Sequence, residues 1–270
     1  MSVPTVHAVL VVDIESYGPR PNPFQASLRR AMYDVLREAC ADAGMDWESI
    51  VHLDRGDGVI LLVPAATSIV TVAGPFLRDL DAVLAEKAAM FSRAHRMRLR
   101  VGLHQGLCQR DDTGWMGEAI NTACRLVDAQ PLRDALAAAS DARMAVIVSD
   151  EIYQTVIRHG YRQMDPASFA PITLAAKELT GATAWISVPG RSYPAGLGAA
   201  RPGPAGARDR RAAADVPAAA PGPAPDAGTV AGRMDIVQRG GIANYGSTTV
   251  QGDQFTGDKY VAGNGNAGAT

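Results

Sequence analysis

The sequence changes character abruptly near Gly190. Of the 43 residues from Gly190 to Gly232, 14 are alanine, 8 are glycine and 7 are proline. Proline has no amide donor, glycine loses much conformational entropy on ordering, and no bulky apolar residue recurs here to offset that cost. We therefore expect a disordered linker over residues 190–232, which confines the folded domain to residues 1–189.

The segment beyond this linker, residues 233–270, is rich in glycine and holds four short apolar stretches. These stretches lie within residues 233–261, and about 30 residues cannot bury a stable core alone. Short strands of this kind can pair with the sheet edge of a protein partner or of a second copy. The other interpretation is plain disorder, and the sequence leaves both open.

Charge and cysteine content exclude several classes of protein. The chain has 26 Lys and Arg against 28 Asp and Glu, which argues against a whole-chain nucleic-acid footprint. No run approaches the roughly 20 apolar residues that cross a bilayer, and the start at Met1 has no basic segment ahead of an apolar core. Cys40, Cys108 and Cys124 lie far apart in the sequence, without the spacing of a zinc site or of a disulfide framework, so we expect reduced structural thiols. We expect a cytoplasmic protein that binds neither membrane nor nucleic acid.

The spacing of apolar residues within 1–189 predicts a mixed fold. The predicted strands cover 6–14, 97–108 and 144–148, with a hairpin at 51–63 that turns at 55–58 and a closing hairpin from 172–174 to 182–188. The predicted helices cover 24–43, 68–91, 117–129 and 132–139, and a short helix opens at 149–150. The order begins β-α-β-β-α-β, the ferredoxin-like unit, so we expect an α+β fold with an antiparallel sheet and helices on one face.

Two aspartates occupy comparable points in this predicted sheet. Asp13 ends the first strand, and Asp57 lies in the turn of the hairpin that pairs beside it. Two carboxylates brought together repel unless a cation lies between them, and oxygen ligands suit Mg²⁺ or Mn²⁺ shared with phosphates. The alternative is an ordinary strand end and an ordinary Gly-Asp-Gly turn. The two residues alone leave both interpretations open.

Four segments carry a family resemblance. They are VDIESY at 12–17, RGDGV at 55–59, LRVGLHQG at 99–106 and GEAINTACRL at 117–126. In this order and at these separations they resemble the catalytic domain of class III adenylate/guanylate cyclases, over most of residues 5–188. The closing WISVPG at 185–190 and the alanine-rich composition are similar to a cyclase-related group from actinobacteria.

The resemblance implies a nucleotidyl cyclase. Asp13 and Asp57 would hold two Mg²⁺ or Mn²⁺ ions that bind a nucleoside triphosphate. The ribose 3′-oxygen would then attack the α-phosphorus, giving a 3′,5′-cyclic nucleotide and pyrophosphate.

The resemblance also implies the remaining contacts to substrate. Asn121 and Arg125, four residues apart on one helix face, would orient the ribose and stabilise charge on the α-phosphoryl group. Lys177 would contact the phosphates. The backbone N–H groups of Ile14, Glu15, Ser16 and Tyr17 would cradle phosphate ahead of the first helix. In such cyclases the aspartates come from one subunit and the Asn, Arg and Lys from the other, so a homodimer would have two composite sites.

The base pocket departs from the family pattern. The two positions that select the purine correspond to Leu53 and Gly114, and neither side chain can hydrogen-bond to a base. Asp54, Asp111 or Asp112 would substitute if the loops shift by a residue or two. The sequence therefore does not identify the base.

A catalytically inactive cyclase-homology module, acting in nucleotide binding or protein–protein signalling, is the alternative. The presence of every residue type that the reaction needs favours the enzyme. Two other features have structural interpretations. His104 is expected to be a hydrogen-bonded strand residue. The basic cluster at 93–100, which includes Arg98 and Arg100, is expected to be a solvated helix end and strand edge.

Overall fold

The computed structural model describes residues 2–90, 96–174, 179–194 and 197. All of them belong to the first of two units into which the chain divides, Met1–Ala207. Lys177, most of the predicted linker and the whole of the predicted tail lie outside the described residues, so these predictions stay predictions.

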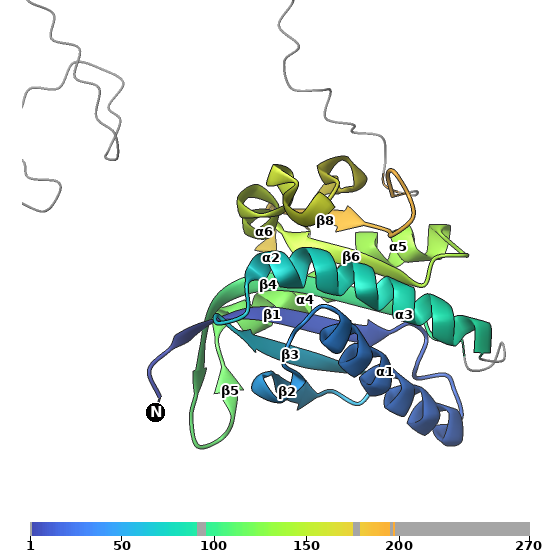
Figure 1. Cartoon of the computed structure of the whole chain (residues 1–270), viewed down its shortest axis with the longest axis horizontal. Coiled ribbons are helices and arrows are strands. Elements are labelled where there is room, and N and C mark those ends of the chain that lie inside the picture. Colours follow the sequence, from blue (N-terminus) through green and yellow to red (C-terminus); the bar gives the residue numbers. More distant parts are fainter. Residues whose placement is uncertain (1, 91–95, 175–178, 195–196, 198–270) are drawn as a thin grey trace, which may run out of the picture. The chain divides into compact units, whose positions relative to one another are not determined.

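An eight-stranded sheet forms the centre of this unit (Figure 1). The strand order is β2-β3-β1-β4-β6-β8-β7, and β5 pairs with β4 off this path. The strands are β1 Thr5–Ile14, β2 Val51–Asp54, β3 Gly58–Pro64, β4 Leu99–Arg110, β5 Trp115–Met116, β6 Met144–Ser149, β7 Ala170–Thr173 and β8 Thr183–Ser187. Within the path, only β4 and β6 run parallel to each other.

The helices connect these strands. The longer ones are α1 Asn22–Asp42, α3 Leu77–Met90, α4 Glu118–Val127, α5 Gln130–Ala138 and α6 Asp150–Thr155. Shorter turns are α2 Ile69–Thr71, the π-helical η2 Val72–Phe76, and the 3-10 turns η1 Trp47–Ser49, η4 Ile157–His159, η5 Tyr161–Gln163 and η6 Pro166–Ser168. Among the described residues, no helix has the length and hydropathy needed to span a membrane.

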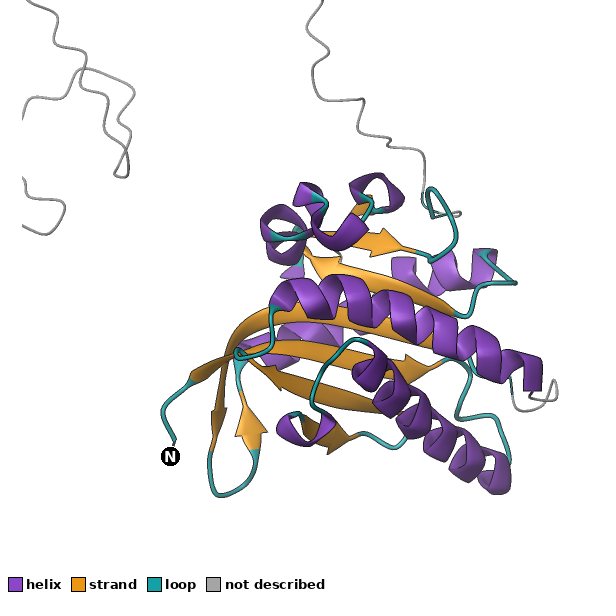
Figure 2. Ribbon diagram, in the orientation of Figure 1, coloured by secondary structure: helices purple, strands orange, loops and turns teal. Residues whose placement is uncertain are grey.

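The α+β fold with its ferredoxin-like beginning is confirmed, but the prediction of helices on one face is wrong. Figure 2 shows α1 and α3 in front of the sheet and α4 and α5 behind it. The parallel pairing of β4 with β6 is the physical reason. Parallel neighbours need a crossover connection, and here α4 and α5 supply it on the second face.

Burial on both faces agrees with the unbroken apolar run of β1. Leu10 and Val12 belong to the core under α1 and α3, whereas Val9 and Val11 belong to the core under α4 and α5. Strands covered on both faces are apolar at every position rather than at alternate ones. β1 is therefore the central strand from which the candidate site extends.

A glycine sets the distance between α4 and the sheet. A Cβ atom at Gly102 of β4 would lie 2.9 Å from the carbonyl oxygen of Ala123 in α4. Only glycine permits this close approach, so Gly102 allows the helix that carries Asn121 and Arg125 to lie flat on the strand.

One predicted helix is divided in the structure. The span predicted as a helix over 68–91 contains α2, η2 and α3. Pro75 lies inside η2 and cannot donate a backbone hydrogen bond, so the chain passes through one π-helical turn before α3 begins.

Candidate active site

The two aspartates lie on neighbouring strands. Asp13 is the cross-strand partner of Gly58, the residue that follows Asp57. The backbone N–H of Ile14 donates to the carbonyl oxygen of Asp57 at 3.0 Å. A Cβ at Gly58 would lie 2.3 Å from the carbonyl oxygen of Val12, so only glycine lets the hairpin come this close. The two acids thus lie at the same end of the sheet, where β1 ends and β3 begins (Figure 1).

Asp13 is largely buried, and its two oxygens differ. Oδ2 forms an ion pair with Arg100, its cross-strand neighbour on β4, and the Asp13 side chain is 13% exposed. Oδ1 is buried and has no hydrogen-bond partner among the described residues. Burial raises the pKa of Asp13, the Arg100 guanidinium opposes the rise, and the nearby charge of Asp57 adds to it. Oδ2 is therefore paired with a cationic group, whereas the hydrogen-bonding capacity of Oδ1 is left unsatisfied.

Asp57 lies in the exposed turn between β2 and β3. The turn is closed by the N–H of Arg55, which donates to the Gly58 carbonyl at 2.9 Å. The N–H of Gly56, at φ +85°, donates to Asp54 Oδ1 at 2.9 Å. This geometry holds Asp57 at the tip, next to the end of β1.

This donor set suits a hard divalent cation. It offers two carboxylates, one of which has a buried oxygen without a partner, and Mg²⁺ and Mn²⁺ complete such sets with water and phosphate oxygens. Across the described residues, no cluster of three or more His, Cys, Asp or Glu side chains forms a metal cage. Two carboxylates fill only part of the coordination shell of such an ion, so this pair fits ions that share their coordination with a substrate.

Helix α4 presents Asn121 and Arg125. Its buried side includes Ala119, Ala123 and Leu126, so Asn121 is exposed and Arg125 is half-buried on the outer side. The two residues are one turn apart and face the same direction.

The turn that carries Asp57 touches this helix within one chain. The Arg55 guanidinium donates to the Cys124 sulfur at 3.3 Å. Asp128, which follows α4, is close enough to help raise the pKa of Asp13, after burial and the charge of Asp57. The last turn of α4 therefore lies near both acids of its own chain, an arrangement that the sequence did not predict.

In the predicted phosphate loop, two of the four backbone N–H groups already donate to carbonyl oxygens of the protein. The N–H of Ile14 donates to Asp57, and the N–H of Glu15 donates to the Arg98 carbonyl at 2.9 Å. Within the described residues, the N–H groups of Ser16 and Tyr17 have no backbone acceptor. Ser16 has φ +53°, a left-handed conformation uncommon for a residue with a side chain. The structure narrows the candidate cradle to Ser16 and Tyr17.

The base-pocket positions remain without polar side chains. Leu53 is half-buried against the core under α4, and Gly114, at φ +142°, has open space where a Cβ would be.

Two of the three substitutes considered for these positions, Asp54 and Asp111, have other partners. Asp54 accepts hydrogen bonds from Arg29 and from the Tyr33 hydroxyl, the latter at 2.7 Å. Partial burial acts to raise the pKa of Asp54, but these bonds hold it below its ordinary value. Asp111 accepts from Thr113 and from the Gly114 N–H inside its own turn.

The expectation of a solvated basic cluster is wrong for Arg98 and Arg100. Their side chains are only 17% and 14% exposed. Arg98 donates to the Ala142 and Ala139 carbonyls at 3.0 and 2.9 Å after α5, and it pairs with Glu15 at 3.1 Å. These arginines fasten α5 and β4 to the end of β1, because buried guanidinium groups need several acceptors.

Sequence reasoning missed the pairing of Arg100 with Asp13. A signal was present, because both residues lie near one end of predicted strands that neighbour each other in a β-α-β-β-α-β sheet. His104 agrees with its structural interpretation: its Nδ1 lies 2.9 Å from the Ser149 hydroxyl, and burial lowers its pKa.

Comparison with known proteins supports the fold through structure alone. No protein-family profile matches the sequence, and no curated protein matches it. The structure is similar to an adenylate/guanylate cyclase/hydrolase from Silicibacter pomeroyi, with 19% identity, a TM-score of 0.50, and coverage of 69% of this chain and 98% of that one.

Two further solved structures are similar at lower scores. The guanylyl cyclase Cya2 has 11% identity and a TM-score of 0.49, over 69% of this chain and 92% of that one. The guanylate cyclase domain of RhGC from Catenaria anguillulae, solved with GTP, has 16% identity and a TM-score of 0.45, over 68% and 96%. The likeness to the Silicibacter pomeroyi protein shows that the chain has the fold of class III adenylate/guanylate cyclase domains.

Proposed function

We propose that this chain is a nucleotidyl cyclase that converts a nucleoside triphosphate into a 3′,5′-cyclic nucleotide and pyrophosphate. The observation that carries the proposal is the pair of acids at one end of the sheet, with Asp13 Oδ1 buried and unsatisfied beside Asp57. A buried carboxylate oxygen without a partner is costly, and a cation is the partner that two neighbouring carboxylates favour.

In the proposed mechanism, Asp13 and Asp57 hold two Mg²⁺ or Mn²⁺ ions. When bound, these ions supply charge neutralisation on the triphosphate and a lower pKa for the ribose 3′-hydroxyl. Arg100 fixes Asp13 Oδ2, so that the carboxylate presents Oδ1 in one orientation. The N–H groups of Ser16 and Tyr17 donate to phosphate oxygens.

Asn121 and Arg125 supply the second half of the proposed site. Asn121 orients the ribose, so that its 3′-oxygen faces the α-phosphorus in line with the leaving pyrophosphate. Arg125 donates to the oxygens of the α-phosphoryl group as charge accumulates there. Fixed donors of this kind are the main contribution of a protein to phosphoryl transfer. Lys177 is proposed to contact the phosphates.

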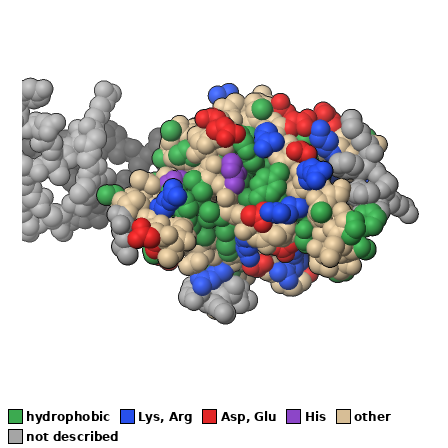
Figure 3. All heavy atoms as spheres, turned by 90° about the horizontal axis from the view of Figure 1, so that it is seen from below, with side chains coloured by type: hydrophobic (Ala, Val, Ile, Leu, Met, Phe, Trp, Pro, Cys, Tyr) green, Lys and Arg blue, Asp and Glu red, His purple; other side chains and the backbone are tan. Residues whose placement is uncertain are grey.

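We propose that two chains associate to form two composite sites. Exposed apolar side chains on β1, β4 and β5 support an interface, with Val6 39%, Leu107 57% and Met116 44% exposed. Figure 3 shows the molecule from below the view of Figure 1, and apolar side chains lie across the middle of the face it draws, between basic and acidic groups. Exposed apolar groups that gather on one face are typical of protein interfaces.

The direct test is product formation. Purified full-length protein is incubated with Mn²⁺ and each of the four nucleoside triphosphates, and products are identified by mass spectrometry. We expect a cyclic nucleotide from at least one triphosphate, and its loss in Asp57→Ala and in Arg125→Ala. Binding of a triphosphate without any product would instead support the inactive cyclase-homology module.

A mixing experiment tests the composite arrangement. Asp57→Ala and Arg125→Ala proteins, each inactive alone, are mixed and allowed to exchange subunits. If the acids and the arginine act across a twofold interface, half of the dimers carry one intact site and about a quarter of wild-type activity returns. Activity in the wild type with no restoration on mixing would place both halves of the site in one chain, as the Arg55–Cys124 contact permits.

A further inference from the structure

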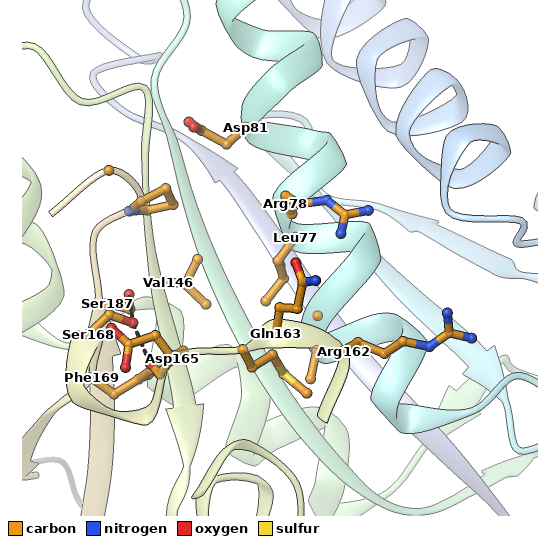
Figure 4. Close-up of a pocket in the computed structure, with 15 residues that line it drawn as sticks. Leu77, Arg78, Asp81, Val146, Arg162, Gln163, Asp165, Ser168, Phe169 and Ser187 are labelled. Carbon is orange, nitrogen blue, oxygen red and sulfur yellow. Dashed lines mark hydrogen bonds between the residues drawn. The ribbon is translucent and has the colours of Figure 1, made fainter. Parts of the chain in front are cut away.

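A hollow region lies on the α3 face of the sheet, apart from Asp13 and Asp57. It has a volume of about 370 Å³ and opens between η2 and α3 on one side and the turns η5 and η6 on the other (Figure 4). β6 contributes Val146 to its floor, and the end of β8 contributes Ser187. No residue proposed to bind the triphosphate lines it. Binding of a ligand at this hollow therefore does not require cyclase activity.

The interior of this hollow is apolar. Leu77 and Ala73 are buried on one wall and Val146 on the floor, each less than 7% exposed. Phe169 forms part of the opposite wall, and its ring lies 6.2 Å from that of Tyr153, which fixes its position. Sites for small molecules have this character, an apolar surface with a few polar groups at the margin.

One end of the hollow is cationic. Arg78, Arg162 and Gln163 also line a neighbouring hollow of about 350 Å³, so the two hollows adjoin at these side chains. In Figure 4 both guanidinium groups extend to the same side of the view, away from Ser168 and Ser187.

The two arginines differ in their partners. Arg78 pairs with Asp79 at 2.9 Å. Arg162 has no hydrogen bond or ion pair within the described part of the chain. The charge of Arg162 is therefore available to a ligand.

The acids around the hollow are mostly occupied. Asp81 pairs with Arg143 at 3.2 Å, and Asp165 accepts from the Ala167 N–H at 2.9 Å at the start of η6. Asp42 lines only the adjoining hollow. The hydrogen bond leaves the charge of Asp165 in place. The unpaired charges of the described lining are therefore Asp165, beside Ser168, and Arg162, at the opposite end of the hollow (Figure 4).

The backbone that carries Arg162 is strained. Arg162 has φ +53° and ψ +37°, and the next residue, Gln163, has φ +63°. Two successive residues with side chains rarely adopt the left-handed region, and such strain persists where neighbours hold it in place, commonly at ligand sites. Met164 holds it here, because it packs on Gly74, where a Cβ would lie 3.2 Å from Met164 Cγ.

The wall that faces Arg162 and Gln163 across the hollow is irregular as well. It is formed by the π-helical turn η2, a feature found frequently at functional sites. Both walls therefore depart from regular geometry at the same place.

We propose that this hollow binds a small organic anion, an apolar body with one acidic group. The apolar body lies between Leu77 and Phe169 over Val146, and the acidic group pairs with Arg162. Gln163 and Arg78, which also line both hollows, flank that acidic group.

The test uses a fluorescent probe of this chemistry, 1-anilinonaphthalene-8-sulfonate, and its uncharged analogue N-phenyl-1-naphthylamine. The full chain is titrated with each probe. We expect one saturable site per chain for the sulfonate, and binding of the uncharged analogue at least about tenfold weaker, a factor that one charge-assisted contact supplies.

Two variants and one control locate the site. Arg162→Gln removes the charge and is expected to make the two probes bind equally. Ser168→Trp places a bulky ring at the half-buried rim and is expected to abolish saturable binding. Arg158→Gln changes a nearby arginine that does not line the hollow, and is expected to bind as the wild type does.

Several results would overturn the proposal. These are the absence of saturable binding, equal affinity of the wild type for both probes, and unchanged sulfonate affinity in Arg162→Gln. If Ser168→Trp fails to fold by circular dichroism, the comparison of the two probes on wild type and Arg162→Gln still decides the question.

Discussion

Asp13 and Asp57 are chemically identical and lie on neighbouring strands, but their surroundings differ. Asp13 is largely buried at the end of β1 in an ion pair with Arg100, and one of its oxygens has no partner among the described residues. Asp57 is exposed at the tip of a turn. Asp13 therefore contributes to the folded structure through its ion pair, in addition to its proposed role in metal binding. For Asp57 we propose the metal-binding role alone.

Because of this difference, variants of the two acids can separate an effect on catalytic activity from an effect on folding stability. A variant at Asp57 removes a proposed metal ligand and leaves the core intact. A variant at Asp13 disturbs both, because a buried ion pair that loses one partner leaves an uncompensated charge. If both acids bind the same ions, their variants should agree in activity and disagree in stability.

The largest expected effect is on activity. Asp57→Asn and Asp13→Asn should each lower the rate of cyclic nucleotide formation at least about a hundredfold, because electrostatic stabilisation of the triphosphate is lost. Initial rates with Mn²⁺ measure this. Asp34→Asn, a change at an exposed position on α1, is the matched control and should keep full activity. A large loss of activity in only one of the two variants would contradict the proposal that both acids bind the same ions.

The next effect is on stability. Asp13→Ala should lower the free energy of unfolding by about 3–5 kcal/mol, because Arg100 remains buried without its partner. Asp57→Ala should change it by less than about 0.5 kcal/mol. Urea denaturation of both proteins measures the difference. The double variant Asp13→Ala, Arg100→Met should recover much of the loss, since it removes both charges.

Equal costs of Asp13→Ala and Asp57→Ala would contradict the difference in their surroundings. So would a double variant that is no more stable than Asp13→Ala alone.

The dependence of stability on pH gives a smaller, signed effect. Burial raises the pKa of Asp13 above its ordinary value of 3.8, so the folded chain holds the proton more tightly than the unfolded chain. The stability that this provides is full below pH 3.8 and is lost as pH rises through the folded pKa. Relative to Asp13→Asn, the wild type should therefore become less stable as pH increases above about 4. An opposite slope in denaturation at several pH values would refute this.

The smallest expected effect is on the choice of base. Leu53 lies on β2, next to the turn that carries Asp57, and has no polar group to offer. Leu53→Lys should change the ratio of products from different triphosphates by less than about tenfold, since one new contact at an unprepared pocket discriminates weakly. Competition between triphosphates in one reaction measures the ratio. A change of a thousandfold would show that the pocket is already built around this position.

Much of the fold could be predicted from periodicity. The strand predicted over 6–14 and the turn at 55–58 both appear in the structure, because unbroken apolar runs and glycine-rich turns have few alternatives. The second helical face was missed, although the apolar run of β1 at every position indicated burial on both sides. Pro75 likewise indicated the break in the helix predicted over 68–91.

The candidate site was predictable in its residue types and less so in its contacts. The approach of Asp57 to Asp13 follows from strand order, but the ion pair with Arg100 depends on the register between β1 and β4, which residue types alone do not give. The Arg55–Cys124 contact depends on how closely α4 lies on Gly102. The cavity under η2 requires strained turns whose geometry has no sequence signature.

Asp13 and Asp57 are proposed to hold divalent ions together against a triphosphate. Electron paramagnetic resonance of Mn²⁺, titrated into the full chain with a non-reactive α,β-methylene triphosphate, tests this proposal without any turnover. We expect nucleotide-dependent Mn²⁺ binding that is lost in both Asp13→Asn and Asp57→Asn. Mn²⁺ binding equal to that of the wild type in either variant would contradict the proposal.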